Sequence, residues 1–246
     1  MSGLRKLTAV ELKLFLREPS AYVWTVIFPV LLLVILGSIP GFRQADPELG
    51  NLRVIDLYIP IIVVMILAMM TLYITPGTIT GYRQKGVLRR LSTTPIGAVR
   101  VLVAQLAVQL GFMVVTVVLT LVTAAILFGA VLPRQGFGFV LALALVAAAM
   151  LAIGLLIAAL VPTASAATGI GTALFFPLMF FGGLWVPREG MPDVLVRIGD
   201  FTPLGAGVQA LRDSSDGNWP SAVALAVLAA YAIAAGALAA RYFRWE

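Results

Sequence analysis

The chain has 246 residues, of which 61% are apolar and 11% carry a formal charge. A soluble domain typically has about 45–50% apolar and about 25% charged residues, so this composition excludes an ordinary soluble protein. The mean hydropathy of +1.04 also excludes a soluble domain with a single membrane anchor. The sequence contains no cysteine and no histidine, which excludes disulfide frameworks and thiolate nucleophiles and removes the commonest general base and metal ligand.

The first segment, residues 1–19, is predicted to form an amphipathic helix at the membrane surface. At about 100° per residue, its cations gather on one face and its apolar residues on the other: Lys6, Lys13 and Arg17 against Leu4, Leu7, Leu14 and Phe15. Such a helix lies along the inner leaflet with its cations toward anionic headgroups, and Pro19 ends it. Both a simple surface anchor and a mechanical role fit this pattern.

Six uncharged segments are each long enough to cross a bilayer, which needs about 20 helical residues. They are residues 22–39, 57–80, 101–128, 137–160, 166–186 and 219–240. The sequence therefore predicts an all-α integral membrane protein with a single transmembrane domain over residues 1–246.

Lys and Arg are distributed unequally between the segments that connect these spans. Eleven of the 17 lie on the side that carries both termini, and six lie on the other side. The positive-inside rule therefore predicts that both termini, residues 81–100 and residues 161–165 are cytoplasmic. The net charge of +6 follows from this topology, so we expect no nucleic-acid partner.

The cytoplasmic segment over residues 81–95 has more pattern than a solvated loop needs. It is too basic to enter lipid, yet Val87, Leu88 and Leu91 are spaced as on one face of a helix. Helix-breaking residues delimit the element: Gly81, Gly86 and Pro95. The pattern predicts a short amphipathic helix that packs against another structure.

The outer segment over residues 187–218 is predicted to form two short helices. Apolar residues follow helical spacing in each half: Met191, Val194, Leu195 and Ile198, then, after Pro203, Leu204, Val208 and Leu211. These helices either rest on the outer leaflet or dip into it as a re-entrant hairpin. Charged residues are expected to mark the water-facing side: Arg188, Glu189, Asp193, Arg197 and Asp200.

The spans carry no groups for energy conversion or hydrolysis. No phosphate loop of the form GxxxxGK followed by Ser or Thr occurs in the sequence, so we expect this chain to bind no ATP. No span contains a carboxylate or cation of the kind that relays protons or sodium ions, and no Ser–His dyad can form. A pump built on this chain therefore needs an energy source on another subunit.

Hydroxyl and aromatic side chains gather in the second and fifth spans and predict a pathway for an apolar or amphiphilic substrate. They are Thr71, Tyr73, Thr75 and Thr78, and Phe175, Phe176, Phe180 and Phe181. The alternative interpretation is structural, because Thr in a membrane helix often bonds its own backbone and Phe often packs in the core or faces lipid.

The order of these features resembles the type-2 permeases of ATP-binding-cassette (ABC) exporters, in particular their drug-exporter branch. The resemblance covers the whole chain. It rests on the amphipathic start, the six spans and two runs of sequence: residues 82–91 with Thr93-Thr94-Pro95, and Gly182-Gly183-Leu184-Trp185-Val186-Pro187 leading through Met191-Pro192 to Thr202-Pro203-Leu204 and Leu211-Arg212. The branch often carries an acid where this chain has Gln84.

This resemblance implies a coupling helix that docks onto a separately encoded ATPase. Its residues in this chain are Tyr82, Arg83, Gln84, Lys85, Gly86, Val87, Leu88, Arg89, Arg90 and Leu91. It also implies two ABC ATPase subunits, which bind ATP and Mg, and a second permease that is either a copy or a paralogue. The chain is then no enzyme itself. It is the permease of an exporter that moves a hydrophobic or amphiphilic small molecule or lipid out across a bacterial cytoplasmic membrane.

Two other functions fit the same residues. One is export of a lipid-linked glycan or polymer, which needs a wider pathway than these residues establish. The other is a membrane scaffold or assembly protein without transport activity. Co-purification with an ATPase whose turnover depends on residues 81–95 distinguishes a transporter from a scaffold.

Overall fold

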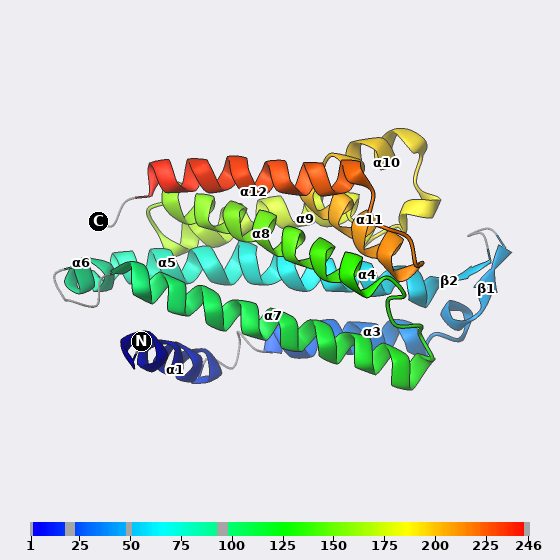
Figure 1. The fold of residues 1–246 in the computed structure, drawn as a ribbon, viewed down its shortest axis with the longest axis horizontal. Helices are drawn as coiled ribbons and strands as arrows, with labels where there is room; N and C mark the ends of the chain where they lie inside the picture. Colours follow the sequence, from blue (N-terminus) through cyan, green and yellow to red (C-terminus); the bar gives the residue numbers. More distant parts are fainter. Residues whose placement is uncertain (1, 18–22, 48–50, 93–97, 244–246) are drawn as a thin grey trace.

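The structure is a computed structural model that describes residues 2–17, 23–47, 51–92 and 98–243. Helices make up most of it, including two π-helical turns, η1 (Val23–Ile27) and η4 (Met70–Ile74), and two 3-10 turns, η2 (Pro40–Arg43) and η5 (Arg188–Gly190). The elements in chain order (Figure 1) are α1 (Ser2–Arg17), η1 (Val23–Ile27), α3 (Phe28–Ser38), η2 (Pro40–Arg43), β1 (Ala45–Asp46), β2 (Leu52–Arg53), α4 (Val54–Met69), η4 (Met70–Ile74), α5 (Thr75–Gln84), α6 (Val87–Ser92), α7 (Ala98–Phe128), α8 (Gly136–Leu160), α9 (Ala164–Phe181), η5 (Arg188–Gly190), α10 (Asp193–Asp200), α11 (Pro203–Ser215) and α12 (Ala222–Tyr242).

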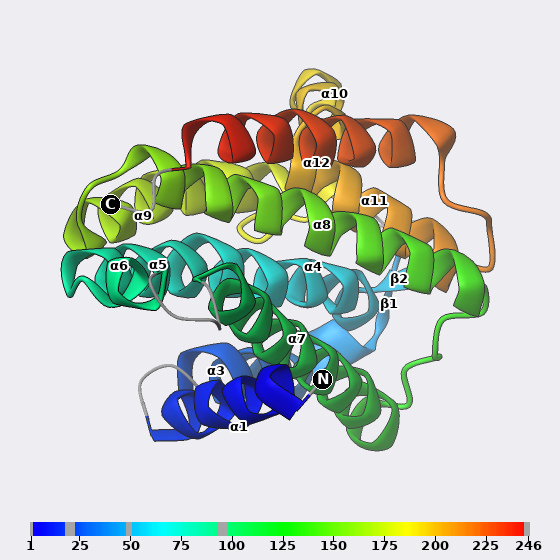
Figure 2. The ribbon, with the colours of Figure 1, turned by 60° about the vertical axis from the view of Figure 1, so that its left-hand side comes forward.

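One long helix lies at the centre of the bundle. α4, η4 and α5 follow one another without a break from Val54 to Gln84, and the side chains of α4 are almost all buried. α3, α7, α8, α9 and α11 pack around it, and α12 covers α8 and α11 (Figures 1 and 2). An apolar helix buried on all sides is expected where neighbouring helices shield it from lipid.

Five helices in the described residues are long and apolar enough to cross a membrane. They are Val54–Gln84, Val99–Phe128, Gly136–Leu160, Ala164–Phe181 and Ala222–Tyr242. The first predicted span forms a shorter apolar helix, Val23–Ser38. The prediction of an all-α membrane protein is confirmed.

The outward faces of the bundle are apolar. On α7, Val114, Val115, Val118 and Ile126 are all more than half exposed. A soluble protein rarely exposes apolar surface on this scale, whereas lipid tails make such a surface favourable. Such faces suit contact with lipid or with another membrane helix.

A short hairpin marks the end of the bundle opposite α6 (Figure 1). β1 and β2 pair antiparallel, with Ala45 opposite Arg53. Neither strand was predicted from the sequence. Arg53 then donates to both carboxylate oxygens of Asp56, at 2.7 and 2.8 Å, in the first turn of α4. We call this end the hairpin end and the opposite one the α6 end.

The two short helices predicted before the last span are α10 and α11, and they differ in environment. α11 packs inside the bundle against α4, α8 and α12, with Leu204, Val208 and Leu211 buried. α11 therefore dips among the spans and does not rest on a membrane surface. α10 instead keeps Val194 and Ile198 exposed, as expected for a helix whose apolar side meets lipid.

Candidate functional site

A cavity of about 800 Å³ lies between α3, the central helix and α9. Among the described residues, no acidic or basic side chain lines it. The lining residues are Trp24, Thr25, Phe28, Leu32, Leu36, Tyr58, Met65, Met69, Tyr73, Ile74, Gly77, Thr78, Phe175, Phe176, Leu184 and Trp185. A cavity of this size and polarity is in the range that binds small apolar or amphiphilic molecules.

Aromatic rings dominate the cavity wall, since seven of its 16 lining residues are aromatic. Phe176 stacks on Trp185 with ring centroids 6.2 Å apart, and Phe175 meets Tyr73 at 5.6 Å. Trp185 and Phe176 are each about half exposed, so they form the rim. Aromatic faces offer large apolar area, and the hydroxyls of the lining Tyr and Thr residues offer hydrogen bonds without charge.

The structure brings only part of the predicted pathway to this cavity. Tyr73, Thr78, Phe175 and Phe176 line it. Thr71 donates to the Leu67 carbonyl at 2.7 Å, within its own helix.

Thr75 donates to Oε1 of Gln109 on α7, at 2.8 Å, and is buried away from the cavity. Phe180 packs edge-on against Phe181 and is absent from the lining. For Thr71, Thr75 and Phe180 the structure therefore favours packing and helix bonding, the alternative interpretation of these residues.

The contribution of the first span to the cavity was not predicted from the sequence. Trp24, Thr25 and Phe28 line one wall of the cavity, and Trp24 meets Phe28 with ring centroids 5.4 Å apart. An aromatic pair at i and i+4 gives two rings on one helix face. That spacing, together with Trp185 beyond the fifth span, is the signal that points to these residues.

A π-helical turn interrupts the central helix beside the cavity. Two residues of this turn, Tyr73 and Ile74, line the cavity. Gly154 of α8 and Gly171 of α9 approach it so closely that a Cβ on either would lie under 3.0 Å from a backbone carbonyl oxygen of η4. π-Helical turns occur often at functional sites, and here the turn fixes how α8 and α9 meet the central helix.

The predicted coupling segment follows directly from α5, the half of this helix nearer the α6 end. α5 ends at Gln84, Gly86 turns the chain with a positive φ of 65°, and α6 follows from Val87 to Ser92. A residue with φ in this region is most readily glycine. Residues 93–95 of the predicted segment, and the side chains of Leu88 and Leu91, lie outside the described part of the chain.

Two side chains at the end of α5 contact the turn between α8 and α9. Arg83 donates to the Val161 carbonyl at the end of α8. Gln84 accepts a hydrogen bond from the Ala164 amide at the start of α9, at 3.3 Å. The segment before α6 is thereby joined to α9, which lines the cavity.

The remaining residues of the predicted coupling set surround this junction. Lys85, Arg89 and Arg90 are exposed, Gly86 and Val87 are partly exposed, and Tyr82 faces α1. The α6 end therefore presents a cationic surface. Such a surface favours an acidic partner.

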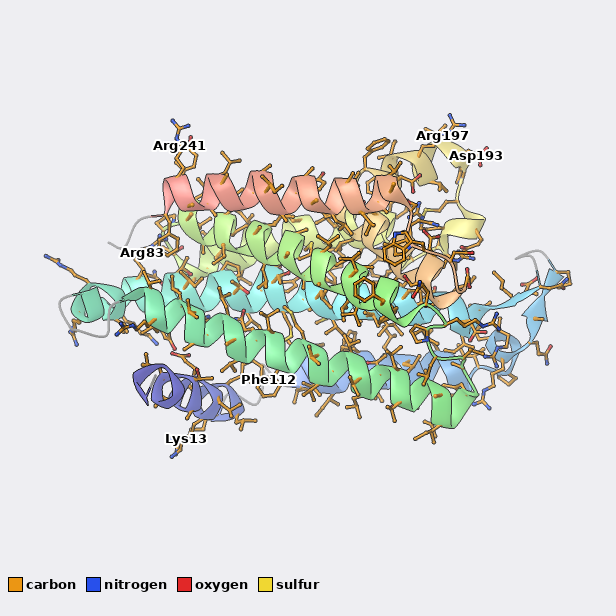
Figure 3. The ribbon with its side chains drawn as sticks, viewed as in Figure 1. Lys13, Arg83, Phe112, Asp193, Arg197 and Arg241 are labelled. Carbon is orange, nitrogen blue, oxygen red and sulfur yellow. The ribbon has the colours of Figure 1, made fainter. Side chains whose placement is uncertain are left out.

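The amino-terminal helix is held to the bundle near the same junction. Phe15 of α1 packs on Phe112 of α7, with ring centroids 4.2 Å apart, and Lys13 points away from the bundle (Figure 3). The hydroxyl of Tyr82 lies 3.0 and 3.1 Å from the two carboxylate oxygens of Glu11. Burial raises the pKa of the Glu11 carboxyl above its ordinary value of 4.5, and the Tyr82 hydrogen bond opposes that shift.

Glu11→Gln is expected to stabilise the purified protein at neutral pH. The raised pKa means that the folded state favours the neutral carboxyl of Glu11. Protonated Glu11 therefore contributes to folding stability below pH 4.5, and this contribution is lost as pH rises through the pKa of the folded state. Glutamine keeps an oxygen acceptor for Tyr82 and carries no charge. The melting temperature of the variant should exceed that of the wild type by an amount that grows as pH rises. A difference that shrinks with rising pH would contradict this assignment.

A buried arginine corrects one prediction about the segment over residues 187–218. Arg188 and Glu189 were expected on the water-facing side, yet Arg188 is only 7% exposed. It pairs with Asp200 and donates to the Gly205 carbonyl at 2.6 Å, while Glu189 pairs with Arg212 of α11. Arg188 can be buried because its partner Asp200 offsets the cost of desolvation, whereas Glu189 remains exposed. Asp193 and Arg197 do project outward from α10 (Figure 3).

Comparison with known proteins agrees with this architecture. Residues 3–214 match the ABC-2 type transporter family. A relative from Bacillus subtilis (strain 168), named as a transport permease, YvfS, is 26% identical over 234 residues, which cover 92% of this chain and 91% of the relative. The family match includes α1, the central helix, the coupling segment and every cavity-lining residue. The chain therefore belongs to the ABC-2 type transporter family and is a transmembrane subunit of an ABC transporter.

Proposed function

We propose that this chain is the permease subunit of an ATP-driven exporter whose substrate is a hydrophobic or amphiphilic small molecule or a lipid. The observation that supports this substrate class is the uncharged, aromatic wall of the cavity beside the central helix. Its volume of about 800 Å³ suits a small ligand better than a glycan polymer. The aromatic and hydroxyl groups bind such a molecule without the cost of burying an unpaired charge.

The energy source in this proposal is a separate ATPase pair, which binds ATP and Mg. The observation that carries the function is the junction at the α6 end, where Arg83 and Gln84 tie the coupling segment to the turn before α9. A push on α6 by the ATPase then moves α5 and α9 together. Both helices line the cavity, so the push changes its shape.

A second permease, either a copy or a paralogue, completes the pathway in this proposal. Trp24, Phe176 and Trp185 line the cavity and are each about half exposed. Large aromatic surface of this kind is typical of protein contacts as well as of lipid contacts. Two permeases that face each other across these rings enclose one shared route.

The orientation follows from charge. The α6 end carries the basic coupling segment, and the positive-inside rule places that end and both termini in the cytoplasm. The membrane is the bacterial cytoplasmic membrane, and transport runs toward the hairpin end. The Lys and Arg distribution along the chain supports this orientation.

Arg83→Ala is expected to uncouple ATP hydrolysis from transport. The change removes the charged hydrogen bond to Val161, and such bonds contribute about 1.5–3 kcal/mol, enough for a roughly tenfold loss. Inverted vesicles with the permease and its ATPase should take up a lipophilic fluorescent dye when ATP is added. Dye taken up per ATP hydrolysed should fall about tenfold in the variant.

Arg241→Ala is the matched control, because Arg241 is an exposed cation at the end of α12. Its ratio of dye to ATP should equal that of the wild type. An unchanged ratio for Arg83→Ala would contradict the coupling role of the α5 junction. Wild-type vesicles that take up no dye from a panel of neutral and amphiphilic dyes would contradict the substrate class.

A further inference from the structure

A second, smaller cavity of about 280 Å³ lies at the hairpin end of the bundle. It is bounded by the start of α4, the outer part of α7, the connection from α7 to α8 and the end of α11. The lining residues are Leu52, Asp56, Leu57, Ile59, Pro60, Leu121, Val131, Pro133, Arg134, Arg212, Ser215 and Asp216. Seven of these 12 residues are apolar, and the other five include two cations and two acids, unlike the uncharged cavity beside α9.

Among the described residues, the two cations that line this cavity differ in their ion pairs. Both carboxylate oxygens of Asp56 accept from Arg53. Arg212 pairs with Glu189 and lies 4.0 Å from Asp216. Arg134 is exposed, and no ion pair joins it to any residue within the ranges that the structure describes.

The backbone holds Arg134 in place beside α11. The amide of Gln135 donates to the Ser214 carbonyl at 3.0 Å, which fixes the connection against the end of α11. Gly217 turns the chain with a φ of 94°, and a Cβ there would lie 3.5 Å from Cβ of Arg134. Arg134 therefore lies against this turn, next to Asp216, and lines the cavity together with Arg212.

Neighbouring residues place this cavity at the depth of lipid headgroups. Phe137 and Trp219 are exposed and stack with ring centroids 6.0 Å apart. Exposed aromatic side chains, Trp above all, concentrate at the boundary between lipid tails and water. Val131 and Leu132 are also exposed and give an apolar surface directly beside Arg134.

We propose that this cavity binds the headgroup of a phospholipid with an amine, such as phosphatidylethanolamine. Arg134 holds the phosphate diester, since guanidinium groups match phosphate oxygens in geometry and charge, and Arg212 adds positive charge beside it while it keeps its pair with Glu189. Asp216, whose side chain is 57% exposed, attracts the ammonium group. The acyl chains lie along Val131 and Leu132. This site is separate from the cavity proposed for the exported substrate.

Native mass spectrometry of the purified, full-length permease with added phosphatidylethanolamine tests the site. Arg134→Gln should weaken lipid binding roughly tenfold, as for loss of one charge-assisted hydrogen bond. Asp216→Asn should remove the preference for phosphatidylethanolamine over phosphatidylglycerol, because the amine loses its partner. Arg197→Gln, an exposed cation on α10 outside this cavity, should leave both affinities unchanged.

Competition with free O-phosphoethanolamine separates a lipid site from a site for a soluble phosphate ester. We expect the free headgroup to compete only at far higher concentration than the lipid, because it lacks acyl chains. Equal competition by the free headgroup would overturn the proposal. Equal lipid binding by wild type and Arg134→Gln would overturn it as well, and Asp216→Asn provides the test if Arg134→Gln yields no folded protein.

Discussion

Replacing Gly171 with alanine is expected to destabilise the permease strongly, whereas the same change at Gly169 is expected to be tolerated. Both glycines lie on α9, two residues apart. A Cβ on Gly171 would lie under 3.0 Å from the carbonyl oxygen of Leu72, a separation that real Cβ atoms essentially never show. A Cβ on Gly169 would meet nothing within 4 Å.

The physical reason is the close packing of two helix backbones. The carbonyl of Leu72 belongs to the π-helical turn η4 and cannot move aside as a flexible side chain would. α9 therefore has to shift, and overpacking of this kind costs about 1–3 kcal/mol and occasionally more. Gly154 of α8 meets the carbonyl of Thr71 in the same way, so Gly154→Ala should behave like Gly171→Ala.

Thermal unfolding of the detergent-purified variants measures this effect. For a chain of this size about 1 kcal/mol corresponds to roughly 2–4 °C in melting temperature, so Gly171→Ala should melt several degrees lower than Gly169→Ala. The same shift of α9 should also reduce transport, since α9 lines the cavity. Equal melting temperatures for the two variants would show that the π-turn contact carries little stability.

The position of each span was largely predictable from the sequence, because the cost of moving a charge into lipid restricts uncharged runs to the spans. Where a span is longer than predicted, a hydrogen-bonding partner stabilises the charged residue at its end. The second span was predicted over residues 57–80, yet its helix extends from Val54 to Gln84. Asp56 is accommodated by Arg53, and Arg83 by the Val161 carbonyl. The spacing of charged residues along the sequence does not reveal such hydrogen-bonding partners.

The burial of Arg188 was beyond prediction for a related reason. Arg188 looks water-facing in the sequence, since charges on a short outer segment usually are. Its partners, Asp200 and the Gly205 carbonyl, come from α10 and α11. Only the packing of α11 into the bundle brings these groups together, and spacing along the chain carries no information about it.

Only some of the residues that line the candidate site were identified from the sequence. The cavity is uncharged and carries aromatic and hydroxyl groups, the kinds of side chain that the sequence pointed to. Tyr73 and Phe175 line it, whereas Thr75 turns toward Gln109. The direction of a hydroxyl on a buried helix depends on the neighbouring helix. The wall from the first span was missed because that pairing of helices is a tertiary feature.

Leu88→Asp is expected to abolish both binding of the ATPase and transport. Val87, Leu88 and Leu91 share helical spacing in the sequence, and the segment from Val87 to Ser92 is helical in the structure. If these residues seat the coupling helix in a groove of the ATPase, aspartate at Leu88 places an unpaired charge there. Burying such a charge costs several kcal/mol, on the order of 3–5 when no partner neutralises it.

Arg89→Ala provides the matched comparison on the same helix. Arg89 is exposed, and a single charge at the rim of an interface contributes about 0–1 kcal/mol. This variant should keep the ATPase bound and retain partial transport. If the segment served only to keep positive charge in the cytoplasm, the relative effects of the two kinds of substitution would reverse. Leu88→Asp would then be harmless, and removing several cations would disturb membrane orientation.

The most direct test of the account is to purify the Leu88→Asp permease from membranes that also contain its ATPase. The amount of ATPase retained and its rate of ATP hydrolysis are then measured, with wild type and Arg89→Ala alongside. We predict that Leu88→Asp is present in the membrane at the wild-type level and retains no ATPase, while Arg89→Ala retains it. A Leu88→Asp permease that holds its ATPase with full transport-stimulated hydrolysis would contradict the coupling role of α6.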